Sequence, residues 1–457
     1  MGFDFLDFGF PKSGTDWKSI NGKPFITVSS KGRSNQLSNK INDGADFGPD
    51  TTLGATSPNQ TGPPYSPTLG IQEAINYVSL PNPKKPIFLY GNFLVSAPIL
   101  IPQYGVDIIG AGWESDANGN AINSLGTTIS PSSTLTQPML AYADPTVQNV
   151  NLHIYNVGFL SNQSYFNGQT WINLKQNETG GTNIIIEKCW FNGYSGNTSP
   201  TTANVIFEGN EDAFFLNDRF QYINGTFLSQ YGSITFENCL FDAEAQNVTF
   251  GAQIANFYNC AFRRFTFYNN SENIINFKGC YWNPSNGPPI QAQGLSTPVY
   301  MSLDNCNITN GQSGSVQPVF GVSSGTTLYV KAKNTVFYSG SGTTGNNINT
   351  SGLYFEFDDQ CQFLNGTPLP TIVKPIPTTP TVPASGTAQQ NTNPYSVNVY
   401  LYGGTVTEIQ ITKNGTAYTV FSNATGLALS GQVYKLDPSN SITITYTTAP
   451  SWNWLSD

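Results

Sequence analysis

Six cysteines are the most reactive side chains in the sequence, and each falls at the same position of a repeated phrase. The phrase reads apolar-x-apolar-x-Asn-Cys-x-Phe, as in ITFENCLF at 234–241. Its alternation predicts that every sulfur points inward from a strand, about 4.8 Å from the next strand. No pair has the C-x-x-C spacing of metal or dithiol sites, although disulfides between stacked pairs stay geometrically open. We therefore expect structural cysteines, no metal and no cofactor. The six are Cys189, Cys239, Cys260, Cys280, Cys306 and Cys361.

Few other residues are suited to acid–base chemistry. His153, the one histidine, lies between the inward positions Leu152 and Ile154, so a surface histidine is favoured over a catalytic one. A polysaccharide lyase needs a base and a clamp for its substrate's carboxylates, and arginines are scarce. They occur at Arg33, Arg219, Arg263 and Arg264.

One group of carboxylates offers a weak catalytic alternative. Glu208, Glu211 and Asp212 follow a strand-like run, and coil stacking could bring such groups to the separations of about 5–10 Å that glycoside hydrolysis uses. Solvated loop charges are the favoured interpretation, so no catalytic residue is predicted. Asp218 stands where other copies of the phrase place Cys or Val. It predicts either a local break in register or a buried, hydrogen-bonded carboxyl.

Aromatic residues favour binding over cleavage. Trp190 and Tyr281 share the outward slot between the Cys and Phe positions, while Tyr222, Tyr231 and Tyr268 fall in nearby loops. Exposed aromatic rings bind sugars by stacking, and they also form contacts between subunits. These five residues are the predicted binding residues.

The repeat itself defines the fold class. Nine copies end on residues 20 to 32 apart, which is the period of a solenoid with loops of variable length. Two short strands flank a turn, and a third strand is expected elsewhere in each coil, as in a right-handed parallel β-helix. Asparagine in the turn tolerates a left-handed backbone and predicts a ladder of asparagines. The closing residues are Phe159, Phe191, Phe220, Phe241, Phe262, Trp282, Ile308, Phe337 and Phe363; the turn asparagines are Asn156, Asn217, Asn238, Asn259, Asn305 and Asn334.

The region from about residue 68 to 366 resembles the pectate-lyase-like superfamily, in which such asparagine ladders recur. Upstream, PTLGIQEAINYVSL at 67–80 places Ile71, Ala74, Ile75 and Val78 on one helical face. Viral tailspikes of this superfamily often begin with such a segment. The helix is expected to cap the open end of the stack.

Four segments follow from composition. Residues 1–66 show little periodicity and predict an irregular leader that docks to a virion. The β-helix covers 67–366, and the Pro/Thr-rich stretch 367–394 predicts a semi-rigid linker. From 395 to 457, alternating runs separated by Gly and Asn predict a small β-sandwich. The whole chain is therefore expected to be all-β apart from the capping helix.

Charge and targeting signals exclude several classes. Only 10% of the residues are charged, the net charge is −9, and the 19 Lys and Arg form no run, so nucleic acid is not an expected partner. No segment is long and apolar enough to span a bilayer, and the N-terminus lacks the pattern of an ordinary signal peptide. Twelve N-x-Ser/Thr sequons indicate a glycoprotein. They begin at Asn59, Asn162, Asn177, Asn197, Asn224, Asn247, Asn269, Asn307, Asn349, Asn365, Asn414 and Asn423.

The leader phrase INDGADFGPDTTLGATSPNQTGPPY, the β-helix and the tail SVNVYLYGGTVTEIQITKNGTAYTVFSNATGLALSGQVYKL together resemble proteins of hyperthermophilic archaeal viruses. In such viruses β-helix chains serve as spikes or attachment fibres. The resemblance implies a tailspike-like protein on the virion surface, outside the cell, that mediates host attachment by binding a surface glycan or protein. It also implies a homotrimer, with the leader contacting other virion proteins. The alternative is an extracellular polysaccharide lyase or glycoside hydrolase of the same fold.

Overall fold

The computed structural model describes most of the chain in two units, Met1–Pro370 and Thr371–Asp457. Each unit is considered by itself. The residues described are 25–30, 45–58, 60–79, 85–113, 126–146, 151–161, 170–175, 183–193, 205–209, 212–221, 225–242, 247–263, 265–268, 273–283, 289–293, 298–310, 319–322, 327–339, 353–364, 377–393, 396–413 and 415–456.

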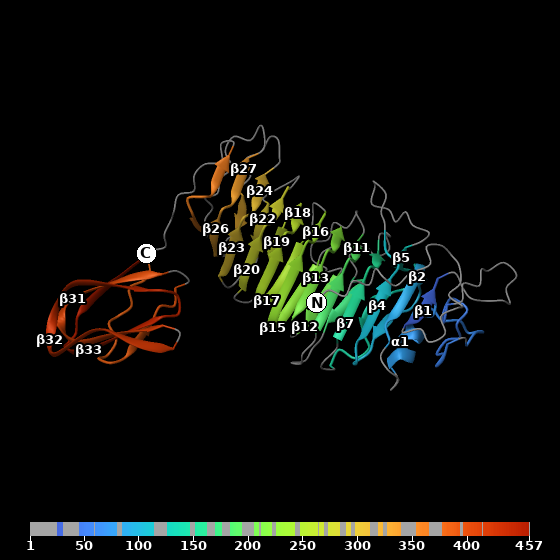
Figure 1. Ribbon diagram of the computed structural model, residues 1–457, viewed down its shortest axis with the longest axis horizontal. Coiled ribbons are helices and arrows are strands. Elements are labelled where there is room, and N and C mark those ends of the chain that lie inside the picture. Colours follow the sequence, from blue (N-terminus) through green and yellow to red (C-terminus); the bar gives the residue numbers. More distant parts are fainter. Residues whose placement is uncertain are drawn as a thin grey trace. The chain divides into compact units, whose positions relative to one another are not determined.

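The first unit is a parallel β-helix with three stacks of strands, as the repeat predicts (Figure 1). In the coils whose three strands are all described, the chain passes through stack 1, turns into stack 2, crosses to stack 3 and returns. Successive coils pair in parallel register, for example Ile186 of β10 (Asn183–Glu187) with Phe215 of β13 (Ala213–Leu216). The third strand that the sequence left unplaced is therefore present.

The bounds of the strands are as follows. Stack 1 contains β1 (Ile26–Ser29), β2 (Ile87–Val95), β4 (Val106–Gly110), β7 (Asn151–Tyr155), β10 (Asn183–Glu187), β13 (Ala213–Leu216), β15 (Gly225–Glu237), β17 (Asn247–Tyr258), β20 (Asn273–Lys278), β23 (Val299–Asp304), β26 (Leu328–Lys333) and β28 (Leu353–Phe357). Stack 2 begins with the second part of β2 and continues through β5 (Thr127–Pro131), β8 (Gly158–Leu160), β11 (Trp190–Asn192), β14 (Arg219–Gln221), β16 (Leu240–Phe241), β18 (Ala261–Phe262), β21 (Tyr281–Trp282), β24 (Asn307–Asn310), β27 (Val336–Ser339) and β29 (Gln362–Leu364). Stack 3 contains β3 (Ile99–Ile101), β6 (Leu140–Tyr142), β9 (Ile172–Lys175), β12 (Val205–Gly209), the first parts of β15 and β17, β19 (Phe265–Tyr268), β22 (Ile290–Gln293) and β25 (Phe320–Val322).

The predicted helix α1 (Ile71–Ser79) packs at the first coils of the stack. The four residues of its predicted apolar face are all buried. Glu73 is buried beside them, where its carboxylate accepts the Ser66 hydroxyl at 2.6 Å and the Gly54 N–H at 3.2 Å. Because both donors lie upstream, the carboxylate joins the helix to the segment before it.

The predicted leader is too long. Strand β1 pairs with β2 as an additional rung, and Val28 and Phe47 are buried in the same core as the helix. The described residues between 25 and 66 therefore belong to the β-helix. The repeated phrase does not predict this rung, because the hydrophobic residues ITV at 26–28 are not followed by the Asn-Cys turn. Residues 1–24 lie outside the described part of the chain.

The turn between stacks 1 and 2 confirms the predicted backbone. All six turn asparagines have positive φ, from 44° at Asn334 to 62° at Asn156, and Lys188 and Gly279 adopt the same conformation in their coils. A side-chain hydrogen bond joins two neighbouring asparagines of the turn: Asn334 Nδ2 donates to Asn305 Oδ1 at 3.3 Å. The left-handed backbone is thus the common feature of the turn, because Lys and Gly adopt it as well.

The cysteine slot that follows each turn has a hydrogen-bonding role. Cys239 Sγ lies 3.2 Å from the carbonyl oxygen of Phe215 in the preceding coil and 3.4 Å from that of Glu237, two residues earlier. Cys260, Cys280 and Cys306 repeat this pattern one coil apart. Thr335 uses its hydroxyl in the same way, donating to the Lys333 carbonyl at 2.8 Å. All six cysteines are free thiols, and all but the half-buried Cys361 are buried, so the structural interpretation is favoured.

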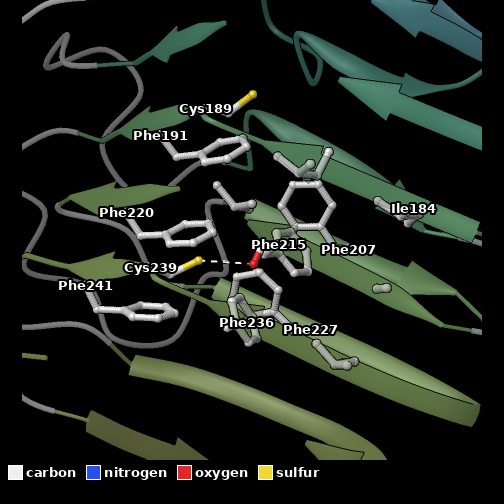
Figure 2. Packing of buried hydrophobic residues seen from close by; sticks show 14 of the residues in the cluster. Ile184, Cys189, Phe191, Phe207, Phe215, Phe220, Phe227, Phe236, Cys239 and Phe241 are labelled. Atoms are coloured by element: carbon white, nitrogen blue, oxygen red, sulfur yellow. Dashed lines mark hydrogen bonds between the residues drawn. The ribbon is translucent and has the colours of Figure 1, made fainter. Parts of the chain in front are cut away.

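Stacked aromatic rings fill the core (Figure 2). Phe191, Phe220 and Phe241 lie one above another on stack 2, with ring centroids 5.2 Å and 4.9 Å apart. Phe215 and Phe236 form a second column on stack 1, 4.6 Å apart, and meet the first column edge to face. Parallel in-register strands place equal residues about 4.8 Å apart, so one phenylalanine per coil gives continuous offset stacking.

The second unit is antiparallel and encloses its own core. It contains β30 (Ala388–Gln390), β31 (Val397–Lys413), β32 (Thr416–Leu436), β33 (Ser441–Thr448) and β34 (Ser451–Ser456). The first part of β31 pairs with β34, and its second part pairs with β33. Strand β32 pairs with β31 along both parts. Residues of both parts share one cluster, so the two layers of the predicted sandwich are halves of a single bent sheet.

The predicted linker 367–394 is also too long. Trp452 Nε1 donates to the Pro380 carbonyl and the Tyr446 hydroxyl to that of Pro383, both at 2.7 Å. Strand β30 adds to β33. The described residues from 377 to 393 are therefore part of the second unit. Their proline carbonyls accept the hydrogen bonds that the tryptophan and the tyrosine donate.

Candidate functional site

The outward surface of stack 2 collects the side chains best suited to binding. It is formed by the residue before the buried closing residue, a Phe, Trp or Ile, in six consecutive coils, and is called here the stack-2 face. These residues are Trp190, Arg219, Leu240, Ala261, Tyr281 and Asn307, paired coil to coil by strand register. Since each sits on a short strand of a filled β-helix, their spacing is fixed by the backbone.

Trp190 departs from the prediction. Its outward position is confirmed by the buried Phe191 beside it, yet Trp190 is fully buried. Trp113 stacks on it with ring centroids 5.3 Å apart, and the Arg219 guanidinium lies 5.8 Å from the centroid of its ring. A sugar cannot stack on a ring covered in this way, so the prediction of Trp190 as an exposed binding residue is wrong. Tyr281 is 40% exposed and stays a candidate.

A charged cluster occupies the same face one coil further on. Arg219 donates to Asp242 Oδ2 at 2.7 Å, and Arg263 Nε lies 3.5 Å from Asp242 Oδ1. The three residues come from consecutive coils, directly on or after β14, β16 and β18. Two arginines against one aspartate leave a net charge of +1 in a chain of net charge −9. The sequence shows both arginines, but only the stacking of the coils shows that they contact the same carboxylate.

The predicted carboxylate group is described only in part. Asp212 Oδ1 accepts both the backbone N–H and the hydroxyl of Ser233, at 2.9 Å and 2.8 Å. Its described contacts therefore stabilise the entry of β15 into stack 1. Glu208 lies on β12, but its side chain is outside the description, as is Glu211 entirely. Their catalytic role stays an untested prediction.

Asp218 resolves the alternatives that its position left open. The register is continuous through β14, and Asp218 is 1% exposed. Its Oδ1 accepts the Cys189 backbone N–H at 2.6 Å, whereas Oδ2 has no hydrogen-bond partner. Burial raises the pKa of the Asp218 carboxyl well above its usual range, and the nearby Glu187 acts in the same direction. Burial in the cysteine slot thus favours the protonated form of the Asp218 carboxyl.

Other predicted site residues have varied positions. His153 lies on the outer side of β7, as expected, with its ring 6.5 Å from that of Tyr155. Tyr222 and the side chains of Tyr231 and Tyr268 lie outside the description. Of the sequons, Asn307 is exposed on β24, and Asn423 is half-buried on β32. In both, the sequon threonine hydroxyl donates to the asparagine Oδ1, at 3.3 Å and 2.9 Å. The Asn247 side chain and the other nine sequon asparagines lie outside the description.

Among the described residues, no group of His, Cys, Asp and Glu has the arrangement of a metal site. Within the same residues, no helix is long and apolar enough to cross a membrane.

Comparisons with known proteins give weak similarities. No protein-family model matches the chain, and no curated protein matches it. Among solved structures, the chain is similar to the tailspike protein of an Acinetobacter phage, with 12% identity, 88% of each chain covered and a TM-score of 0.30. It is also similar to the enzymatically active domain of tailspike protein 4 of bacteriophage CBA120, with 10% identity and a TM-score of 0.30. That match covers 85% of this chain and 65% of the other. At a TM-score of 0.30 these similarities are too weak to define the fold, which is instead defined by the strand pairing described above.

Proposed function

We propose that the chain is a tailspike-like virion protein that binds the surface of a host cell through the stack-2 face. The observation that carries the proposal is the row of outward side chains on consecutive rungs. Exposed Leu240 lies on the middle rung of the Arg219–Asp242–Arg263 cluster, and exposed Tyr281 lies on the rung after it. Arginine side chains donate several hydrogen bonds and an exposed tyrosine ring offers a flat apolar surface. Together they suit a glycan, which presents hydroxyl groups and ring faces.

The remaining partners follow from the same proposal. We assign docking to other virion proteins to residues 1–24, because the described residues after them contribute to the β-helix. Copies of the chain associate as a homotrimer on the virion surface. The sequence resemblance favours a virus of a hyperthermophilic archaeon as the source.

Binding to cells tests the proposal directly. Labelled full-length protein is incubated with candidate host cells, and the bound fraction is measured over a range of concentrations. Replacing Tyr281 by Ala is expected to weaken binding about tenfold, equivalent to about 1.4 kcal/mol, as for a typical interface aromatic. Tyr104→Ala is the matched control, because Tyr104 is an exposed tyrosine at 56% that lies outside the stack-2 face. Equal affinity of both variants and the wild type would remove this face as the binding site.

The location is tested by immunogold electron microscopy with an antibody against residues 395–457. Label on projections of virus particles would support the spike. Label in particle-free medium, together with shortening of a polysaccharide by the purified protein, would favour the lyase or hydrolase alternative instead.

A further inference from the structure

The second unit has an outer sheet surface that lies opposite its core. Over its first part, β31 lies between β32 and β34, and its residues alternate between the core and the outside. Val397, Val399 and Leu401 are buried in the core, so Tyr400 and Tyr402 point outward. Tyr402 is 49% exposed and Tyr400 is half-buried. The two tyrosines therefore share the outer side of one strand, about 7 Å apart.

The strand register surrounds both tyrosines with mostly polar side chains. Residues directly opposite each other in an antiparallel pair point to the same face of the sheet, so each tyrosine has one neighbour on β32 and one on β34. Every one of the neighbours on those two strands is exposed. The surface is called here the β31 platform, and its nine members are Asn398, Tyr400, Tyr402, Ser430, Val433, Lys435, Ser451, Asn453 and Leu455.

The side chains of the β31 platform complement the two surfaces of a sugar ring. The tyrosine rings are flat and apolar, which suits the C–H face of a sugar. The serine hydroxyls and asparagine amides beside them donate and accept hydrogen bonds, which suits the sugar hydroxyls. Asn453 is held in position, because its Oδ1 accepts the Thr379 hydroxyl at 2.8 Å. Thr379 Oγ1 in turn accepts the Trp454 N–H at 3.0 Å, so the contact is fixed to the backbone of β34.

Charge and size distinguish an uncharged glycan from other occupants. The nine residues include no carboxylate and one cation, Lys435, in a chain of net charge −9. That net charge repels a polyanion, and one lysine lacks the bidentate geometry with which arginine recognises carboxylates. Three positions on each of three strands extend about 10 Å by about 13 Å. This area is several times smaller than the roughly 800 Å² that each partner buries in a stable protein complex.

We infer that the second unit binds an uncharged polysaccharide on the β31 platform. The Tyr400 and Tyr402 rings pack against sugar rings, and the serines and asparagines bind the hydroxyl groups around them. The site is separate from the stack-2 face, because the spacing of its residues is set by β31, β32 and β34 alone. It therefore adds a binding activity that the proposed function does not require.

The test is affinity electrophoresis of the full-length protein in native gels that contain dextran, galactomannan or xyloglucan, all of which are uncharged polysaccharides. At least one of the three is expected to retard the wild type in a concentration-dependent way. Tyr402→Ala is expected to weaken this binding at least tenfold, as for an aromatic residue at the centre of a binding site. Tyr418→Ala is the matched control and should bind like the wild type. Tyr418 is 54% exposed on the same unit, but it pairs with Ile411 on the other side of the sheet.

A second variant keeps the inference testable if Tyr402→Ala does not fold. Ser430→Glu replaces an exposed serine of the platform, opposite Tyr402, and is also expected to weaken binding at least tenfold. Unchanged retardation of both variants would overturn the inference. Retardation of the wild type by none of the three polysaccharides, or by polygalacturonate alone, would overturn it as well.

Tyr281→Ala separates this inference from the proposed function. Retardation that Tyr281→Ala retains and Tyr402→Ala loses would support the platform, whatever the outcome of the cell-binding experiment. Retardation that Tyr281→Ala loses and Tyr402→Ala retains would place the polysaccharide on the stack-2 face. That result would overturn the inference and support the proposed function.

Discussion

Replacing Asp218 by Asn is expected to change how the stability of the β-helix depends on pH. In the folded chain the Asp218 carboxyl is fully buried and its pKa is raised, so it keeps its proton to a higher pH than in the unfolded chain. In the unfolded chain an aspartate ionises above about pH 4. The unfolded state therefore gains stability relative to the folded state as the pH rises from about 4 to the folded pKa. The contribution of Asp218 to stability is complete below pH 4 and is lost progressively above it.

The magnitude follows from one proton. A single group that is protonated only in the folded state lowers the free energy of unfolding by about 1.36 kcal/mol for each pH unit. Between pH 5 and 7 the wild type is thus expected to lose stability relative to Asp218→Asn, by at most about 2.7 kcal/mol. The amide keeps an oxygen for the Cys189 N–H that Asp218 Oδ1 accepts, and replaces Oδ2, which has no partner, by a donor. The backbone carbonyl of Leu216, two residues before Asp218, can accept a hydrogen bond from this new donor. Thr335 makes the equivalent bond in its own coil, where its hydroxyl donates to the Lys333 carbonyl.

The assay is urea unfolding followed by fluorescence at pH 5, 6 and 7, approached from both the folded and the unfolded side. The quantity compared is the difference in free energy of unfolding between wild type and variant, in which contributions from all other groups cancel. Asp107→Asn supplies the matched control, because it removes the same charge from an exposed position on β4. A constant difference between wild type and Asp218→Asn across this range would refute the assignment of a neutral, buried acid.

Three further predictions test the core, the cysteine slot and the boundary of the leader. Phe236→Ala removes a ring stacked at 4.6 Å and 4.9 Å on its neighbours and is expected to cost about 3–5 kcal/mol in urea unfolding, whereas Tyr281→Ala at the surface should cost less than about 0.5 kcal/mol. Cys239→Thr should be more stable than Cys239→Ala by about 1 kcal/mol, because a hydroxyl can donate to the same carbonyls; equal stabilities would contradict the hydrogen-bonding role of the slot. Deleting residues 1–66 removes β1 and should give aggregated protein by light scattering, while deletion of 1–24 should stay soluble; the reverse would return the whole leader to an independent segment.

The candidate site was predictable only in part. Sequence periodicity identified the outward positions of Arg219 and Tyr281, because alternation within a strand sets direction. It gave the wrong exposure for Trp190, since Trp113 covers it from a distant part of the sequence. Similarly, alternation showed that Asp218 points inward but left open whether the register breaks; that depended on the Cys189 N–H in the preceding coil.

The sequence by itself determined the parallel β-helix, its capping helix, its left-handed turns and the inward cysteines. These features repeat once per coil, and each depends on local stereochemistry or on stacking against an equivalent residue in the next coil. The tertiary structure decided the features that occur once: the rung contributed by β1, the docking of residues 377–393 on the second unit and the Arg219–Asp242–Arg263 cluster. Each of these is set by contacts between residues far apart in the chain, for which no period in the sequence provides a signal.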